Sequence, residues 1–262
     1  MSHLSAKRIS AGYGKQNVIE NISFQLDEGT LMGIIGANGS GKTTLLKALC
    51  GILPHQGSCT LGDAGLEELP AKQLAKLVSY IPQRSGISID ISALDVVLMG
   101  FNPRLGLLEH PTKKMKDTAM EALDQVGLAG KEETNYLHLS EGQKQLCILA
   151  RTLVSDSKLL LLDEPESALD FRFRHQMLAL LRNWVASQDR SAIVTLHDPM
   201  LALNFCDKLL LLWDGGVLDI IEPKTDSLDK MEQMLSMVYG SISLQRCHNR
   251  KGEAQIVMLR ED

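Results

Sequence analysis

The sequence predicts an α/β fold with an antiparallel β region at its start and a helical insert in its middle. Two continuous apolar runs, Leu159–Leu162 and Ala192–Leu196, have the length and flanks of strands buried on both faces of a parallel sheet. The stretch Phe171–Ser187 between them has a helical pattern. An alternation of strand, helix and strand is typical of the α/β class.

The N-terminal region, Leu4–Leu26, is expected to form the antiparallel strands. Segments such as Asn21–Leu26 alternate polar and apolar residues, which is the pattern of a half-buried strand. Near the other end, a strand-like run at Lys208–Trp213 is followed by a turn at Asp214–Gly216.

A phosphate-binding pattern follows the antiparallel region. Residues Gly36–Thr43 read Gly-Ala-Asn-Gly-Ser-Gly-Lys-Thr, a complete G-x-x-x-x-G-K-[ST] sequence between a strand-like and a helix-like run. Its backbone N–H groups can wrap phosphates, Lys42 can reach the β and γ oxygens, and the Thr43 hydroxyl can bind Mg²⁺. A glycine-rich turn without a ligand is disfavoured by these flanks. The residues predicted to hold a nucleoside triphosphate are Gly36, Ala37, Asn38, Gly39, Ser40, Gly41, Lys42, Thr43 and Thr44.

The middle of the chain, Ser88–Leu139, is predicted to be helical. Ser92 and Asp95 have the spacing of a capping box ahead of an apolar run. Thr112–Val126 has the pattern of an amphipathic helix that bears lysines. We therefore expect a helical subdomain at roughly residues 88–155.

Two carboxylates end the first apolar run. Asp163 can hold Mg²⁺ through its water shell, and Glu164 can polarise an attacking water molecule. A strand that simply ends in charged, solvent-facing residues would look the same. The phosphate loop in the same chain favours the catalytic interpretation.

Composition limits the function classes. The chain has 262 residues, 44% hydrophobic and 23% charged, and it contains no run of about eighteen apolar residues. The first residues lack the apolar core of a secretory signal, so we expect a cytosolic protein. The net charge of −5 argues against a nucleic-acid partner. The five cysteines form no C-x-x-C pair, and we expect buried, reduced thiols without a metal.

The segment Leu139–Gln143, Leu-Ser-Glu-Gly-Gln, resembles the Leu-Ser-Gly-Gly-Gln signature of the ATP-binding cassette (ABC) ATPases. Independently of that resemblance, Ser140 and Gln143 have the spacing of a capping box, which predicts a helix start and an anion site. The resemblance implies that Ser140, Gly142 and Gln143 contact nucleotide held by the opposite subunit.

Other segments are similar to the remaining motifs of this family, in the same order, although each alone would be unremarkable. Tyr13 resembles the aromatic residue that stacks on adenine. Gln83 resembles the glutamine that meets Mg²⁺ and the transmembrane partner, and His197 the histidine that contacts the γ-phosphate. Ser167–Asp170 matches the loop that crosses the dimer interface.

The resemblance thus implies an ABC nucleotide-binding domain that uses ATP and Mg²⁺. The implied catalytic residues are Glu164, His197 and Gln83, and the implied metal ligands are Thr43, Gln83 and Asp163. The residues implied to bind nucleotide outside the phosphate loop are Tyr13, Ser140, Gly142, Gln143 and Asp170.

Three residues depart from the family pattern. Glu141 replaces a glycine, and its carboxylate would repel phosphate, so we expect the side chain to point aside. Glu166 stands where the family usually has threonine or serine, and Leu146 where arginine is common. None of the three removes a phosphate ligand, so we expect activity to be retained.

Looser motifs resemble the ATPase subunits of bacterial importers for iron–siderophore, haem and cobalamin chelates. They are Ala93–Gly100, Asn102–Gly106, Ala122–Leu128 and Val238–Gly240. The resemblance implies one ABC domain over residues 1–262 that hydrolyses ATP to drive uptake. The implied partners are a second copy, transmembrane permease subunits and, indirectly, an extracytoplasmic substrate-binding protein. The implied location is the cytoplasmic face of the cell membrane.

Two other classes remain to be weighed. A soluble, non-transport ABC ATPase, such as an iron–sulfur assembly component, stays open as the alternative. A nucleotide-binding regulator without turnover is disfavoured, because Glu164 and His197 are both present.

The segment Ala93–Phe101 is apolar on nearly every side of a helix. Such a helix either packs within a small core or presents a face that another protein covers. Because the segment closely follows Gln83, we expect the second arrangement, with Met99 and Phe101 in a docking surface for a permease.

Overall fold

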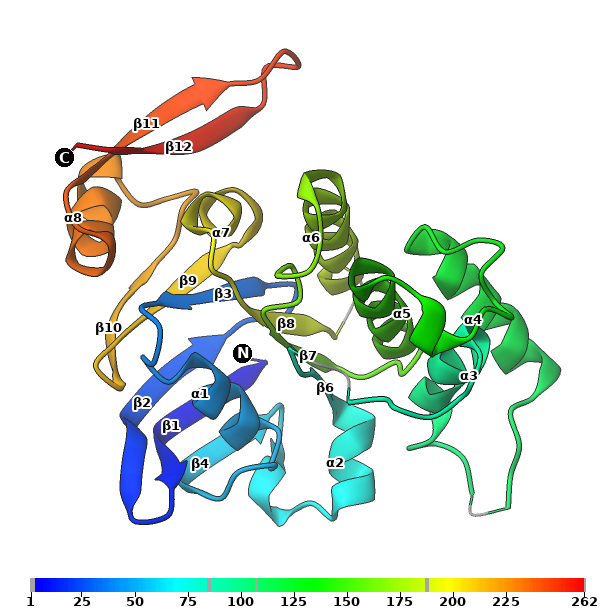
Figure 1. Cartoon of the computed structure of the whole chain (residues 1–262). Helices are drawn as coiled ribbons and strands as arrows, with labels where there is room; N and C mark the ends of the chain where they lie inside the picture. The colour runs from blue at the N-terminus through cyan, green and yellow to red at the C-terminus, as the bar shows by residue number, and fades with distance from the viewer. Residues whose placement is uncertain (1–2, 84–85, 107, 187–188, 262) are drawn as a thin grey trace.

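The computed structural model describes residues 3–83, 86–106, 108–186 and 189–261, and it confirms the predicted α/β fold (Figure 1). The strands are β1 (Leu4–Tyr13), β2 (Gln16–Leu26), β3 (Leu31–Gly36), β4 (His55–Leu61), β5 (Ala64–Gly65), β6 (Val78–Ile81), β7 (Leu159–Asp163), β8 (Ser191–Thr195), β9 (Lys208–Trp213), β10 (Gly216–Ile221), β11 (Ile242–His248) and β12 (Ala254–Arg260). The α-helices are α1 (Lys42–Leu49), α2 (Ala71–Leu77), α3 (Ala93–Leu98), α4 (Lys113–Gln125), α5 (Glu141–Leu153), α6 (Phe171–Val185), α7 (Pro199–Phe205) and α8 (Leu228–Tyr239). Short 3₁₀ turns lie at η1 (Leu66–Glu68), η2 (Met99–Phe101) and η3 (Tyr136–His138).

The central sheet has the strand order β10-β9-β3-β8-β7-β6. Strands β9, β3, β8, β7 and β6 run parallel, and β10 is antiparallel to β9. Every residue of β7 and β8 is buried. This burial confirms the two predicted parallel strands, because only a sheet covered on both faces buries consecutive side chains.

Successive side chains of β7 enter different hydrophobic cores. Leu160 and Leu162 join the core under the helices α3 to α8, whereas Leu159 and Leu161 join the core under α1 and the antiparallel sheet. Because neighbouring side chains on a strand point to opposite faces, an apolar run without alternation is needed here.

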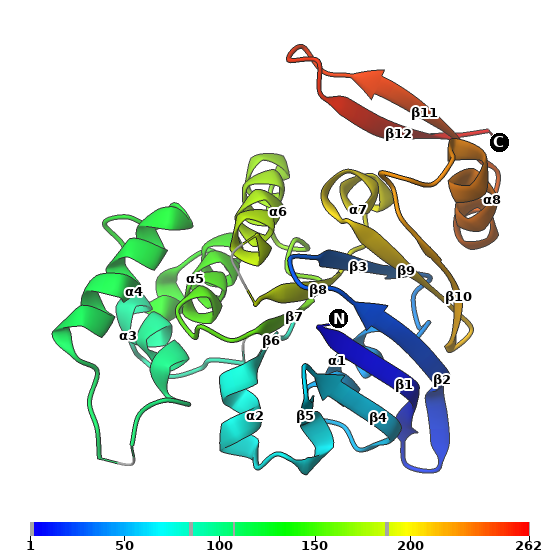
Figure 2. The same ribbon diagram turned by 180° about the vertical axis from the view of Figure 1, so that it is seen from behind.

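The antiparallel region is confirmed as a second sheet with the order β2-β1-β4-β5. Strands β1 and β2 pair from Leu4 opposite Leu26 to Tyr13 opposite Gln16. Figures 1 and 2 show this sheet and α1 on the same side of the central sheet. Strand β5 forms one edge of the antiparallel sheet.

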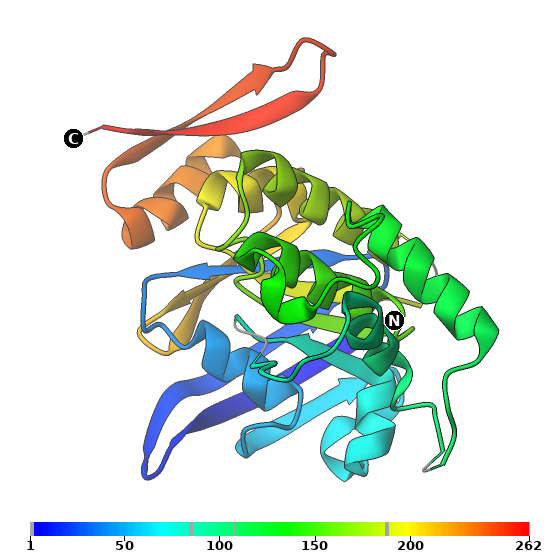
Figure 3. The same cartoon turned by 45° about the vertical axis from the view of Figure 1, so that its right-hand side comes forward.

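Helices α3, α4 and α5 pack against one another and share a hydrophobic core with the central sheet (Figure 3). The predicted cap at Ser92 is present, because its hydroxyl accepts a hydrogen bond from Asp95 N. The Thr112 hydroxyl forms a further cap, which was not predicted, by accepting from Met115 N. These caps satisfy backbone donors that the first turn of each helix leaves free.

The prediction of an apolar docking surface on Ala93–Phe101 is wrong for most of that segment. Val96 and Val97 are fully buried, and Phe101 is only 7% exposed. These side chains pack in the core that α4 and α5 share, so the alternative of a small core applies. Met99 is half-buried. The all-round apolar pattern therefore reflects a helix enclosed on several sides.

Two smaller expectations need correction. Cys59, Cys147 and Cys206 are buried, but Cys50 is half-buried and Cys247 is exposed on the terminal hairpin; all five are free thiols. The predicted helix at Phe171–Ser187 ends at Val185, and Ser187 lies outside the described residues.

The chain ends in α8 and the hairpin β11–β12, which Figures 1 and 2 show projecting beyond α7, far from the antiparallel sheet. Leu244 and Ile256 anchor the hairpin in the core beside α7 and α8. In the described part of the chain, no helix has both the length and the apolar character needed to cross a membrane.

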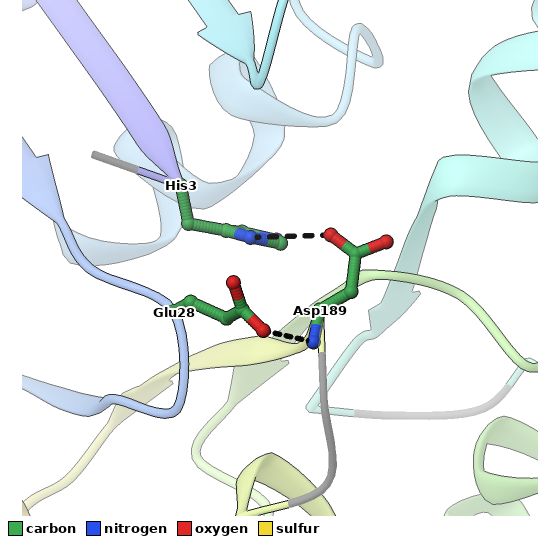
Figure 4. A group of neighbouring side chains, drawn as sticks. All are labelled: His3, Glu28 and Asp189. Carbon is green, nitrogen blue, oxygen red and sulfur yellow. Dashed lines mark hydrogen bonds and ion pairs between the residues drawn. The ribbon is translucent and has the colours of Figure 1, made fainter. Parts of the chain in front are cut away.

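A cluster of polar side chains connects the N-terminal residues to the segment before β8 (Figure 4). Nδ1 of His3 lies 3.8 Å from Oδ1 of Asp189, and Glu28 accepts a hydrogen bond from Asp189 N. Lys158 pairs with the same aspartate. The positive charge of Lys158 offsets the negative charges of Glu28 and Asp189. These contacts connect segments that are far apart in the sequence, so we assign them a structural role.

Candidate functional site

The predicted phosphate loop connects β3 to α1 at the carboxyl edge of the parallel sheet. Gly41 has φ +99°, and a Cβ there would lie 2.3 Å from Cγ2 of Ile19. Only glycine fits, because the position demands a left-handed backbone and closely approaches β2. The N-terminus of α1 therefore points into the loop, where its dipole favours anions.

Lys42 is held against this loop. Its Nζ donates to the carbonyl oxygens of Gly36 and Ala37 at 2.8 and 3.1 Å. Burial lowers the pKa of Lys42, and the charges of Glu164 and Asp163 partly offset that effect. The ammonium group thus lies against the loop, where it is influenced by the charges of the predicted catalytic residue Glu164 and the predicted metal ligand Asp163.

The loop fits a phosphate chain. The Ser40 hydroxyl is buried, and no hydrogen-bond partner for it exists in the part of the chain that the structure describes. A buried polar group without a partner is costly, and a phosphate oxygen would satisfy it.

The carboxylate of Asp163 accepts hydrogen bonds from three hydroxyl groups. Thr43 Oγ1 and Thr195 Oγ1 each donate to Oδ1 at 3.0 Å, and Tyr80 Oη donates to Oδ2 at 3.3 Å. The carboxylate is 3% exposed. Thr43 and Asp163 together offer the oxygen donors that Mg²⁺ prefers, with Asp163 able to act through water, so these residues fit the ion.

Glu164 stands at the centre of the predicted catalytic residues. Its Oε1 lies 2.7 Å from His197 Nε2, and its Oε2 accepts from Gln83 Nε2 at 2.5 Å. Its φ of 48° is in the left-handed region, which costs a non-glycine residue about 1–3 kcal/mol. Thr195 Oγ1 holds this backbone by accepting from Glu164 N at 2.8 Å. The structure thus brings Glu164, Gln83 and His197 together.

The signature residues form a second group. The Ser140 hydroxyl and the Gln143 amide make the predicted capping box at the start of α5. Ser140, Gly142, Gln143 and Asp170 line a cavity of about 430 Å³ to which none of the phosphate-loop residues contributes. Asp170 also caps α6, because Oδ1 accepts from Phe173 N at 3.0 Å.

The structure shows the surroundings of the three residues that depart from the family pattern. The Glu141 carboxylate pairs with Lys144 at 2.7 Å, and Glu141 also lines the cavity beside Ser140 and Gly142. Leu146 is buried in the core of the helical cluster. Glu166 is also buried, and its Oε1 accepts a hydrogen bond from His197 N at 3.0 Å.

Tyr13 lies at the exposed end of β1, with 54% of its surface accessible, and is free to contact a planar ligand. Thr195 and Tyr80, by contrast, were not predicted as site residues. Thr195 had a signal, since it ends the apolar run just before His197. Tyr80 had none, because only the pairing of β6 with β7 brings it beside Asp163.

Comparisons with known proteins agree with this geometry. Residues 19–167 match the model of a family described as ABC transporter. The "Hemin import ATP-binding protein HmuV" of Bordetella bronchiseptica is 36% identical over 248 residues, which cover 90% of this chain and 92% of that protein. The "Manganese transport system ATP-binding protein MntB" of Listeria monocytogenes is 34% identical over 207 residues, covering 78% of this chain and 84% of that protein. Among solved structures, a chain of an inward-facing, metal-chelate type ABC transporter has a TM-score of 0.82 at 28% identity, and the match covers 100% of this chain and 99% of that one.

Proposed function

The chain belongs to the ABC transporter family of ATP-binding proteins, and from that premise we propose that it is the ATP-hydrolysing subunit of a metal-chelate importer. The observation that carries the proposal is the position of Glu164, between Gln83 and His197 and next to Asp163. The relatives named for haem and manganese transport support an importer. The alternative of an iron–sulfur assembly ATPase has no such support.

Each residue of the site has a proposed task in hydrolysis. The phosphate-loop amides and Lys42 hold the β- and γ-phosphates, and Tyr13 stacks on adenine. Glu164 orients the attacking water and draws its proton, while His197 contacts the γ-phosphate. Thr43, Gln83 and Asp163 would hold Mg²⁺, which would supply positive charge to offset the negative charge of the phosphates.

We further propose that the complete site needs two copies. Ser140 and Gly142 lie at the N-terminus of α5, where free backbone donors and the helix dipole favour an anion. Because they line a different cavity from the phosphate loop, their anion is the γ-phosphate held by the second copy. A pair of identical subunits can place each signature on the other's nucleotide.

This shared site predicts that ATPase activity per subunit rises with the concentration of the isolated protein. The rate should level off once sedimentation shows mostly dimer, because pairing follows mass action. Ser140→Arg should abolish the rise, whereas Ser58→Arg, at an exposed position on β4, should retain it. A constant rate per subunit across a monomeric range would contradict the shared site.

A groove beside Gln83 is the proposed contact for the permease. A cavity of about 510 Å³ lies between the Gln83 segment and α5, and its lining includes Ile87, Lys144 and Gln145. Gln145 Nε2 donates to the Gln83 carbonyl at 2.7 Å, so the groove is linked to a residue that contacts Glu164. We propose that residues 88–155 act as a helical subdomain that carries this groove at the cytoplasmic face of the membrane.

Ile89 gives a test of this contact. It is 55% exposed and lies two residues beyond Ile87, so Ile89→Asp should lower co-purification with the permease by about tenfold, the effect of about 1.4 kcal/mol. ATPase activity of the isolated subunit should stay within about twofold, since surface changes rarely disturb the fold. Ile52→Asp is the matched control, because Ile52 is 58% exposed and lies after α1. Equal losses in both variants would contradict the assignment.

Uptake by a deletion strain tests the proposed function as a whole. The strain is supplied with haem, a ferric siderophore or cobalamin, and growth on at least one should require the gene. An extracytoplasmic substrate-binding protein would deliver that compound. Complementation should succeed with the parent gene and fail with Glu164→Gln. Normal use of all three compounds by the deletion strain would argue against a metal-chelate importer.

A further inference from the structure

Glu166 is a carboxylate in an unusual environment. It lies in the turn that follows Asp163-Glu164-Pro165, and it is 2% exposed. Its Oε1 accepts a hydrogen bond from His197 N at 3.0 Å, and its Oε2 has no hydrogen-bond partner within the described ranges. None of the proposed contacts to phosphate or to Mg²⁺ involves the Glu166 side chain.

Burying such a group is unfavourable for stability. A buried carboxylate loses its hydration, and one oxygen here gains no hydrogen bond in return. Burial raises the pKa of Glu166, and the hydrogen bond from His197 N partly opposes that effect. A small hydroxyl residue, as the family usually has at this position, would avoid most of this cost. The cost therefore points to a role in function.

The contacts of the turn suggest that role. Two hydrogen bonds join residues 164–166 to residues 195–197: Glu164 N donates to Thr195 Oγ1 at 2.8 Å, and His197 N donates to Glu166 Oε1 at 3.0 Å. The imidazole of His197 in turn lies 2.7 Å from the Glu164 carboxylate. Fixing the His197 backbone at one side thus fixes the imidazole relative to Glu164.

We propose that Glu166 is a positioning residue for ATP hydrolysis, which holds His197 in register with Glu164 through the His197 backbone N–H. The inference rests on the proposed function and adds a residue-specific support that this chain uses in place of the usual hydroxyl. Glu166 itself does not contact the reacting atoms. Its loss should therefore lower the rate of the chemical step and leave ATP binding largely intact.

Two substitutions separate the hydrogen bond from the charge. Glu166→Gln keeps an acceptor oxygen for His197 N, whereas Glu166→Leu has a similar volume and no acceptor. We expect Glu166→Leu to lower kcat by about ten- to a hundredfold, as a misplaced catalytic group does, with KM for ATP within about twofold. Glu166→Gln should keep kcat within about threefold of the parent, because the amide oxygen can replace the carboxylate oxygen.

A double variant tests whether Glu166 acts through His197. If it does, Glu166→Leu combined with His197→Ala should be no slower than His197→Ala alone, since coupled residues are not additive. Thermal unfolding of all variants is measured in parallel, and the midpoints of the Glu166 variants should not fall below that of the parent, because the substitutions remove a costly buried carboxylate. A merely structural role would instead lower both the thermal unfolding midpoint and kcat in each of the two single variants.

The outcomes are distinguishable from a failure of the proposed function. Parent activity with an inactive Glu164→Gln and an unchanged Glu166→Leu would overturn this inference and leave the function intact. Equal losses in Glu166→Gln and Glu166→Leu, or an additive double variant, would also overturn it. A parent protein without ATPase activity would overturn the proposed function itself.

Discussion

Glu164→Gln is expected to lower kcat for ATP hydrolysis by about a hundred- to ten-thousandfold, the usual contribution of a general base. The amide has the size of the carboxylate but cannot draw a proton from water. It can still contact His197 and Gln83, which lie 2.7 and 2.5 Å from the carboxylate oxygens. ATP binding should therefore change by less than about threefold, because the phosphate contacts are untouched.

The measurement is steady-state phosphate release together with equilibrium binding of an ATP analogue. Glu121→Gln is the matched control, since Glu121 is an exposed carboxylate on the surface of α4. The control should hydrolyse ATP at the parent rate. Comparable rates for Glu164→Gln and the parent would remove Glu164 from its assigned role.

Lys42→Ala is expected to act at an earlier step, by weakening nucleotide binding itself. The substitution removes the ammonium group that is proposed to hold the phosphates and that lies within hydrogen-bond distance of the loop carbonyls. Hydrogen bonds to charged groups contribute about 1.5–3 kcal/mol each, so we expect affinity for ATP to fall by about ten- to a hundredfold. The fold should survive, because alanine is favourable in the first turn of α1.

Lys47→Ala is the control for this change, because Lys47 lies on the same helix and is half-buried beyond the loop. Titration with a fluorescent ATP analogue should show parent-like affinity for the control. If Lys42→Ala instead binds nucleotide as tightly as the parent and loses only turnover, the assignment of Lys42 to phosphate binding is wrong.

The nucleotide site was largely predictable because its residues lie in short, ordered motifs. The pattern Gly36–Thr43 fixes its own geometry, since Gly41 must be left-handed where the loop crosses β2. The apolar run before Asp163 places that carboxylate at the same sheet edge, because parallel strands end together. Hydrophobic periodicity and local motifs were therefore enough to predict the fold class and the positions of the main chemical groups.

The remaining features depend on contacts between distant segments. Tyr80 reaches Asp163 only because β6 pairs with β7, and Glu166 meets His197 only because two loops lie side by side. The segment Ala93–Phe101 misled the docking prediction for a related reason. Its apolar pattern does not reveal that α4 and α5 already enclose it.

In the proposed mechanism, ATP is held between the phosphate loop of one copy and the Ser140 signature of another. Sedimentation of Glu164→Gln with and without ATP and Mg²⁺ tests it most directly, since this variant should accumulate the ATP-bound state. We predict a dimer with ATP and a monomer without it, and we predict that adding Ser140→Arg restores the monomer. A mass that does not respond to ATP, or an ATP-dependent dimer that persists with Ser140→Arg, would contradict the account.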